Sequence, residues 1–155
     1  TGVQTCALPI LNLRDKSFSH IGIASLEQDT VFIYHAIGGE FNPDQKLKRE
    51  PIWSFAHPDD NKKIGIFRMK MCNELIPQLI NSVHHIYAMA IPFDMDFDLT
   101  TDNRLYCAEF VGKSFEQALK RAHFFHRSLL MGKAFIEVDD ITGNQSVRKI
   151  QSWEY

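Results

Sequence analysis

Cys107 has the residue type and the placement that nucleophilic catalysis requires. It follows an acidic, aromatic loop at residues 92–103, whose end favours helix caps, so we expect it near the first turn of a helix. A thiol reacts as its thiolate, and the partial positive charge at a helix N-terminus favours that form. The unpaired N–H groups of the same turn can also donate hydrogen bonds to an oxyanion beside the sulfur. Cys107 is therefore the candidate nucleophile.

A general base for this thiol must come from elsewhere in the chain, and His20 and His35 are the candidates. They lie in apolar runs rich in β-branched residues, at residues 20–26 and 31–37, which a polar stretch at residues 27–30 separates. This pattern predicts a β-hairpin with one histidine in each strand.

The register of this hairpin decides whether the two imidazoles meet. If residues 27–30 form a four-residue loop, Leu26 pairs with Val31 and Gly22 lies opposite His35. His20 is then the diagonal neighbour of His35, with about 7–8 Å between the backbones. Gly22 has no side chain to separate the rings. A three-residue loop would instead place the two rings on opposite faces.

The remaining elements must position these residues. We expect a strand at residues 64–69, a helix at 73–89, and strands at 134–138 and 147–153, with a turn at 142–144. A second helix at residues 105–125 would place one set of apolar side chains on one face: Val111, Phe115, Ala118, Ala122 and Phe125. Residues 40–61, which contain three prolines and many charges, predict a long loop with one helical turn around Trp53. Strands and helices are mixed in this order without a regular βαβ alternation, which indicates an α+β fold with an antiparallel sheet.

Bulk composition limits the possible partners. The chain of 155 residues is 45% hydrophobic and 12% aromatic, which suits one domain with a real core. Its 17 basic and 19 acidic residues give a net charge of -2, so no basic field indicates a nucleic acid or an anionic membrane. No apolar stretch approaches the roughly 20 residues of a membrane-spanning helix. The oligomeric state is not indicated.

Metal and disulfide motifs are weak in this sequence. Three cysteines, Cys6, Cys72 and Cys107, form neither a disulfide framework nor a zinc motif, and Cys72 is interpreted as inert. The aspartates at 94, 96 and 98 imitate a calcium loop, but Leu99 stands where that loop needs Gly. The histidine pairs at 84–85 and 123–126 lack a third ligand. We therefore expect no cofactor and no metal.

Four motifs together resemble a known family. They are SHIGI at residues 19–23, YHA at 34–36, FDMDFD at 93–98 and LYCAEFV at 105–111. They are similar to motifs of the YiiX/YebB-like hydrolases, in the circularly permuted branch of the NlpC-type papain-like superfamily. The likeness extends from residue 17 to residue 115, and the order of histidine before cysteine is typical of the permuted branch.

The resemblance implies a papain-like fold, with an antiparallel sheet packed against helices, and a Cys-His-His triad. Cys107 would be the nucleophile, His20 the base and His35 the residue that orients His20. The chain departs from the family at His35, where Glu is more common, and at Ala108, where Ser is common. The Gly-Asp strand that usually precedes the histidine motif is absent. Residues 1–10 resemble translated adapter sequence, so we expect a foreign leader, a missing native N-terminus and one domain at residues 11–155.

The expected reaction is hydrolysis of an amide, such as a cell-wall peptide or another small amide, through a thioester acyl-enzyme. Two alternatives remain open. The first is a lipid esterase, thioesterase or acyltransferase, because relatives in the permuted branch act on lipid esters and acyl groups. The second is a binding module that kept the fold and lost catalytic activity. The resemblance is compatible with the cell envelope or periplasm, but the chain has no export signal that would fix the compartment.

Overall fold

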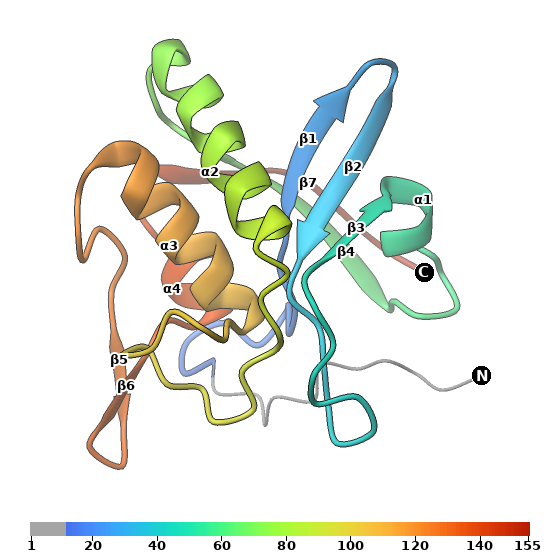
Figure 1. Cartoon of the computed structure of the whole chain (residues 1–155). Coiled ribbons are helices and arrows are strands. Elements are labelled where there is room, and N and C mark those ends of the chain that lie inside the picture. Colours follow the sequence, from blue (N-terminus) through green and yellow to red (C-terminus); the bar gives the residue numbers. More distant parts are fainter. Residues whose placement is uncertain (1–11) are drawn as a thin grey trace.

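The computed structural model describes residues 12–155 of the chain. The expectation of a foreign leader at residues 1–10, and with it Cys6, lies outside this range. The described part has mixed α and β structure, and its strands are paired antiparallel (Figure 1). Within it, no helix has both the length and the apolar character needed to cross a membrane.

The predicted hairpin is present as β1 (Ile23–Glu27) and β2 (Thr30–His35). Leu26 pairs with Val31 and Ile23 with Tyr34, so the predicted register is confirmed. The pairing continues to Glu27 and Thr30, which leaves only two residues between the strands, and the first of them, Gln28, has a φ of 54°. A positive φ in a two-residue turn matches the right-handed twist of the flanking strands.

A third strand completes this sheet, and it corrects the expectation of a long loop at residues 40–61. β3 (Lys48–Pro51) pairs antiparallel with β2 in a sheet of order β1-β2-β3. The one-turn helix α1 (Ile52–Phe55) follows at once and contains the expected turn around Trp53. β3 has a charged sequence and ends in proline, so its side chains give no strand pattern.

The other long strands form a separate two-stranded ribbon. β4 (Lys63–Met69) and β7 (Val147–Glu154) were both expected, and they pair antiparallel along their lengths, from Lys63 with Glu154 to Met69 with Val147. A register shift between Ile66 and Phe67 interrupts the ladder. In Figure 1 this ribbon crosses behind the hairpin. The strands therefore form several antiparallel sheets rather than one.

Two helices cover the core. The 3₁₀ turn η1 (Asn73–Leu75) leads into α2 (Ile76–Ala88), as the sequence predicts, with Pro77 in the first turn. α3 (Cys107–Leu119) packs against α2 and against β2. The core that these elements share includes Val83, Phe110 and Val111.

α3 is shorter than expected because Lys120 adopts the left-handed conformation and ends the helix. Ala122 and Phe125 lie beyond its end, although Phe125 is still buried. A short hairpin, β5 (Ser128–Leu130) and β6 (Lys133–Phe135), follows. The strand expected at residues 134–138 stops at Phe135, and Val138 begins α4 (Val138–Thr142). The Asp140 side chain accepts a hydrogen bond from the Glu137 N–H at 3.0 Å, which favours a helix start there.

Candidate active site

His20 and His35 meet as the register requires. His20 Nε2 and His35 Nδ1 are 2.8 Å apart, and the ring centroids are 5.0 Å apart with the planes at 74°. Gly22 makes room for this contact, because a Cβ there would lie 2.8 Å from the Tyr34 carbonyl oxygen and 3.1 Å from His35 Cβ. Two of the three predicted catalytic residues are therefore in direct contact.

Glu50 extends this pair from the third strand. Lys48 is paired with His35 in the β2–β3 ladder, so Glu50 is the diagonal neighbour of His35. Its Oε1 lies 2.8 Å from His35 Nε2, and its Oε2 accepts a hydrogen bond from Ser54 Oγ at 2.9 Å. We call the hydrogen-bonded series His20, His35, Glu50 and Ser54 the histidine chain. It joins the segment just before β1, where His20 lies, to β2, β3 and α1.

Burial makes these hydrogen bonds electrostatically strong. His35 is 1% exposed, and burial lowers its pKa against the opposing effect of Glu50. The hydrogen bond from His35 lowers the pKa of Glu50 to about 2. At neutral pH the pair is thus a neutral imidazole beside a carboxylate. The ring of Phe55 packs against both histidines, with centroids 5.0 Å from His35 and 5.7 Å from His20, and shields the chain on that side.

Cys107 is the first residue of α3 and is fully buried. The helix start that was predicted for the nucleophile is confirmed. The structure brings His20 and His35 together and packs α3 against β2, the strand that ends at His35. Direct contact between Cys107 and His20 stays a prediction.

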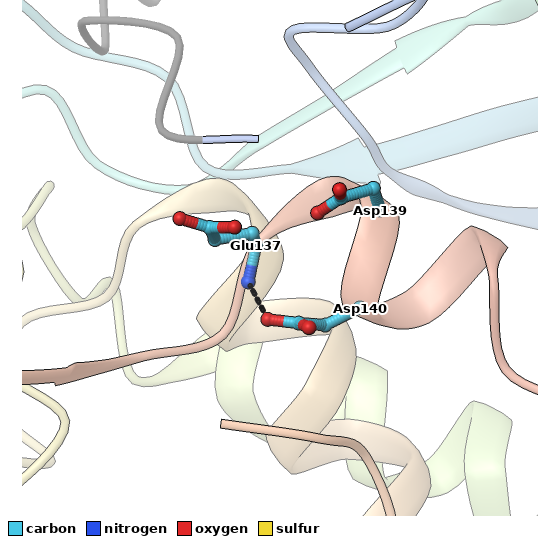
Figure 2. A group of neighbouring side chains, drawn as sticks. All are labelled: Glu137, Asp139 and Asp140. Carbon is cyan, nitrogen blue, oxygen red and sulfur yellow. Dashed lines mark hydrogen bonds between the residues drawn. The ribbon is translucent and has the colours of Figure 1, made fainter. Parts of the chain in front are cut away.

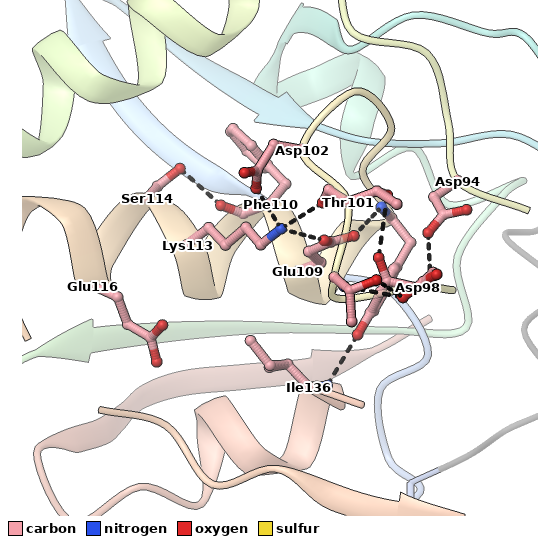
Figure 3. A network of polar contacts seen from close by, with 12 residues as sticks. Asp94, Asp98, Thr101, Asp102, Glu109, Phe110, Lys113, Ser114, Glu116 and Ile136 are labelled. Carbon is pink, nitrogen blue, oxygen red and sulfur yellow. Dashed lines mark hydrogen bonds and ion pairs between the residues drawn. The ribbon is translucent and has the colours of Figure 1, made fainter. Parts of the chain in front are cut away.

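A polar network fixes the first turn of α3 (Figure 3). Tyr106 N–H donates to Glu109 Oε2 at 3.2 Å, and Glu109 Oε1 forms an ion pair with Lys113 at 2.7 Å. Lys113 also donates to the Thr101 carbonyl oxygen at 2.8 Å. Glu109 is fully buried, and burial raises its pKa to about 7. The acid beside the candidate nucleophile thus holds the helix start in place.

Tyr106 anchors the same turn to the C-terminal part of the chain. Its hydroxyl accepts a hydrogen bond from the buried Ile136 N–H at 2.9 Å, which Figure 3 shows at the base of the network. A buried N–H without a partner would cost about 1–3 kcal/mol. The position of Cys107 is therefore tied to residues about thirty positions away in sequence.

Sequence reasoning missed Glu50 because it lies in the segment that was interpreted as a loop. His35 stands at the position expected to orient His20, and the carboxylate of Glu50 stands one hydrogen bond further out. The sequence of β3 gave no signal for a strand, because it is charged and ends in proline. Only its pairing with β2 shows that it is one.

A second group of polar side chains was also missed. Glu137, Asp139 and Asp140 are all buried, and one carboxylate oxygen from each lies within 4.8 Å of the others (Figure 2). We call these three residues the acidic cluster. No other group of three or more possible metal ligands occurs among residues 12–155. The signal was the sequence EVDD at residues 137–140, of which only residues 137–138 were included in the predicted strand, as its end.

Arg14 is the basic partner of the acidic cluster. Its guanidinium pairs with Asp140 Oδ1 at 2.5 Å, and the backbone N–H groups of Arg14 and Asp15 donate to Asp139 Oδ2 at 2.8 and 3.1 Å. An open cavity of about 290 Å³ adjoins the cluster and is lined by Arg14, Asp139 and Lys149, among others. The cluster thus holds the segment that precedes β1.

The acidic cluster still has excess negative charge. If all three carboxylates were ionised, the single guanidinium would leave two negative charges without a cationic partner within the group. Neither oxygen of Glu137, nor Asp139 Oδ1, has a hydrogen-bond partner of normal geometry among the described residues. Burial, then Asp140 and Asp139, raise the pKa of Glu137 to about 7, against smaller lowering effects of Ser128 and Leu13.

The other candidate ligands have ordinary structural roles. The carboxylate of Asp94 accepts hydrogen bonds from the N–H groups of Asp96 and Asp98, at 2.9 and 2.6 Å, and so holds a turn of the acidic loop. Cys72 is exposed just before η1. Its predicted inertness stays a prediction.

Comparison with known proteins gives one fold match. No family model matches the chain, and no curated protein sequence matches it. The crystal structure of YiiX from Escherichia coli O157:H7, described as a metalloprotein, superposes with a TM-score of 0.72. The match has 16% sequence identity and covers 89% of this chain and 84% of YiiX. The chain therefore has the YiiX fold, and the expected likeness to YiiX-like proteins is supported at the level of fold.

Proposed function

We propose that this protein is a cysteine hydrolase in which Cys107 is the nucleophile, His20 the general base and His35 the residue that orients His20. The observation that carries the proposal is the 2.8 Å contact between His20 and His35 beside a sheet that packs on the helix starting at Cys107. The YiiX fold supports the likeness to YiiX-like proteins on which the expectation of a papain-like arrangement rests.

In the proposed reaction His20 takes the thiol proton and the Cys107 sulfur attacks a carbonyl carbon. The carbonyl π electrons move to oxygen, and the N–H groups of the first turn of α3 donate to that oxyanion. When the tetrahedral intermediate collapses, the bond to the leaving amine or alcohol breaks and His20 returns the proton to it. Water, deprotonated by His20, then attacks the thioester and releases the acid, and the thiol is restored.

The proposed substrate is a small amide, such as a peptide of the cell wall. Lipid esters and thioesters are the rival substrates, and they share the acyl-enzyme chemistry. Turnover of short-chain aryl esters, long-chain esters and muropeptide fragments should be compared in parallel. Cleavage of long-chain esters alone would exclude the amidase proposal and favour the lipid esterase.

The first test is the pH dependence of iodoacetamide alkylation, followed by peptide mass spectrometry. Exposed Cys72 serves as the internal control, and His20→Ala as the variant. We expect Cys107 to react well below pH 8 and ahead of Cys72, and to lose this advantage without His20. Because Cys107 is buried, a smaller neutral alkylating reagent should be used alongside to separate access from activation. Equal titration of both thiols would favour the binding module instead.

Divalent cation binding at the acidic cluster is a second candidate function. The uncompensated carboxylate oxygens of Glu137 and Asp139 favour it, and YiiX is described as a metalloprotein. Carboxylate oxygens suit hard cations such as Ca²⁺, Mg²⁺ or Mn²⁺. One such ion would balance the two excess negative charges without displacing the charge of Arg14.

Calorimetric titration of the protein with MnCl₂ and with CaCl₂ tests this second candidate. Saturable heat with a rise in melting temperature is expected for the parent chain, and its loss for Glu137→Gln. Asp60→Asn, an exposed acid far from the cluster in sequence, is the matched control. Equal heats in parent and Glu137→Gln, or no saturable heat with either ion, would overturn the candidate. Because the readout is binding, this result is independent of the hydrolase test.

A further inference from the structure

We infer that Glu50 is a positioning residue of the proposed active site: it selects the tautomers of His35 and His20 so that His20 Nδ1 carries the lone pair used as base. This inference rests on the proposed hydrolase function for its catalytic meaning. The tautomers themselves follow from hydrogen bonds within the described residues.

The argument begins at the carboxylate. Glu50 has a pKa of about 2, so at neutral pH it can only accept hydrogen bonds. At 2.8 Å, His35 Nε2 must therefore carry the proton that points at Glu50 Oε1. The Ser54 hydroxyl donates to the other oxygen and fixes the orientation of the carboxylate.

The proton on Nε2 determines the other nitrogen of His35. Burial lowers the pKa of His35, so the ring is neutral and its Nδ1 is an acceptor. His20 Nε2, which lies 2.8 Å from that Nδ1, must donate. In a neutral His20 the lone pair then stands on Nδ1.

The remaining nitrogen is where a base is needed. His20 Nδ1 is buried and has no hydrogen-bond partner among residues 12–155, so no other described group competes for its lone pair. When it takes a proton, the positive charge of His20 faces His35, and the negative charge of Glu50 stands behind that ring. Glu50 thus supplies the carboxylate that a histidine alone at position 35 lacks.

A purely structural role for the Glu50–His35 ion pair is the competing explanation. It would lower stability on substitution, but it would not predict a particular tautomer at His20, two hydrogen bonds away. Nitrogen chemical shifts of the histidines distinguish the two explanations, because protonated and unprotonated ring nitrogens resonate far apart.

The experiment uses the full chain with ¹⁵N-labelled histidine at pH 7 and compares the parent with Glu50→Gln, Glu50→Ala and Ser54→Ala. We expect both His20 and His35 in the Nε2–H form in the parent and in Glu50→Gln, whose amide oxygen still accepts. Glu50→Ala should lose the single tautomer at both rings. Glu40→Gln is the control, because Glu40 is exposed and is not part of the histidine chain. An Nδ1–H form at either ring of the parent, or unchanged tautomers in Glu50→Ala, would overturn the inference.

Alkylation of Cys107 provides the functional arm. Glu50→Ala is expected to slow it about tenfold, a modest part of the ~10²–10⁴ that a positioned base contributes. Glu50→Gln, which keeps the acceptor but loses the charge, should lie between Glu50→Ala and the parent. Equal rates in the parent and Glu50→Ala would also overturn the inference. If the tautomers behave as expected while Cys107 of the parent never reacts, the proposed function fails and the tautomer assignment stands.

Discussion

The histidine chain and the acidic cluster both bury ionisable groups, but they compensate them differently. In the histidine chain each hydrogen-bonded acceptor faces a donor, and the one negative charge, on Glu50, lies between His35 and Ser54. In the acidic cluster three carboxylates converge on one guanidinium. Burial of charge is tolerated where partners are matched, and an excess requires a proton or a cation. The first region is thus a hydrogen-bonded series with one carboxylate, and the second is a group of carboxylates with one guanidinium partner.

The largest expected effect is on the histidine chain. His35→Ala removes both hydrogen bonds that His35 makes, so Cys107 alkylation at pH 7 should fall by about 10²-fold or more. His85→Ala, an exposed histidine on α2, is the matched control and should leave the rate unchanged. Near-parental alkylation in His35→Ala would show that His35 does not orient the base.

Arg14→Gln tests how far a matched partner stabilises the acidic cluster. The cluster loses its one cationic partner, and the free energy of unfolding should fall by about 1–3 kcal/mol at pH 7. Urea denaturation measures this change. Arg148→Gln, an exposed arginine on β7, should stay within about 0.5 kcal/mol of the parent. If both variants match the parent, the guanidinium does not stabilise the cluster.

Gly22→Ala tests how closely the histidine chain is packed. The added Cβ would lie 2.7 Å from Ile33 Cγ2 and 2.8 Å from the Tyr34 carbonyl oxygen. We expect a loss of about 1–3 kcal/mol in unfolding free energy, with slower Cys107 alkylation. Ser19→Ala, an exposed neighbour in the same segment, controls for general effects. Parental stability together with parental reactivity would contradict the packing argument.

The pH dependence of stability gives the smallest expected effect. Because the pKa of Glu137 is about 7 in the folded protein and 4.5 ordinarily, the folded state binds more protons between these values. Stability should therefore fall as pH rises from about 4.5 to about 7. Glu137→Gln should remove this part of the decline in buffer with a chelator. Glu109, whose pKa is also about 7, titrates in both proteins and so cancels in the comparison. Identical pH slopes in the two proteins would contradict the expected titration of Glu137.

Local patterns determined much of this protein. The apolar, β-branched-rich runs predicted the hairpin, and a four-residue polar stretch between them was one of two loop lengths considered, the one whose register the structure has. The acidic loop before residue 107 and the apolar face that follows placed Cys107 at a helix start. These features depend on neighbours in sequence, so composition and spacing are sufficient to predict them.

Only the tertiary structure decided the rest. β3 is a strand because β2 offers it hydrogen bonds, and Glu50 reaches His35 only through that pairing. Lys120 ends α3 in the left-handed backbone conformation, which a lysine in the sequence does not predict. The acidic cluster acquires its partner from Arg14, more than 120 residues away in sequence. Long-range contacts of this kind depend on the closure of the whole chain, which residue spacing alone does not specify.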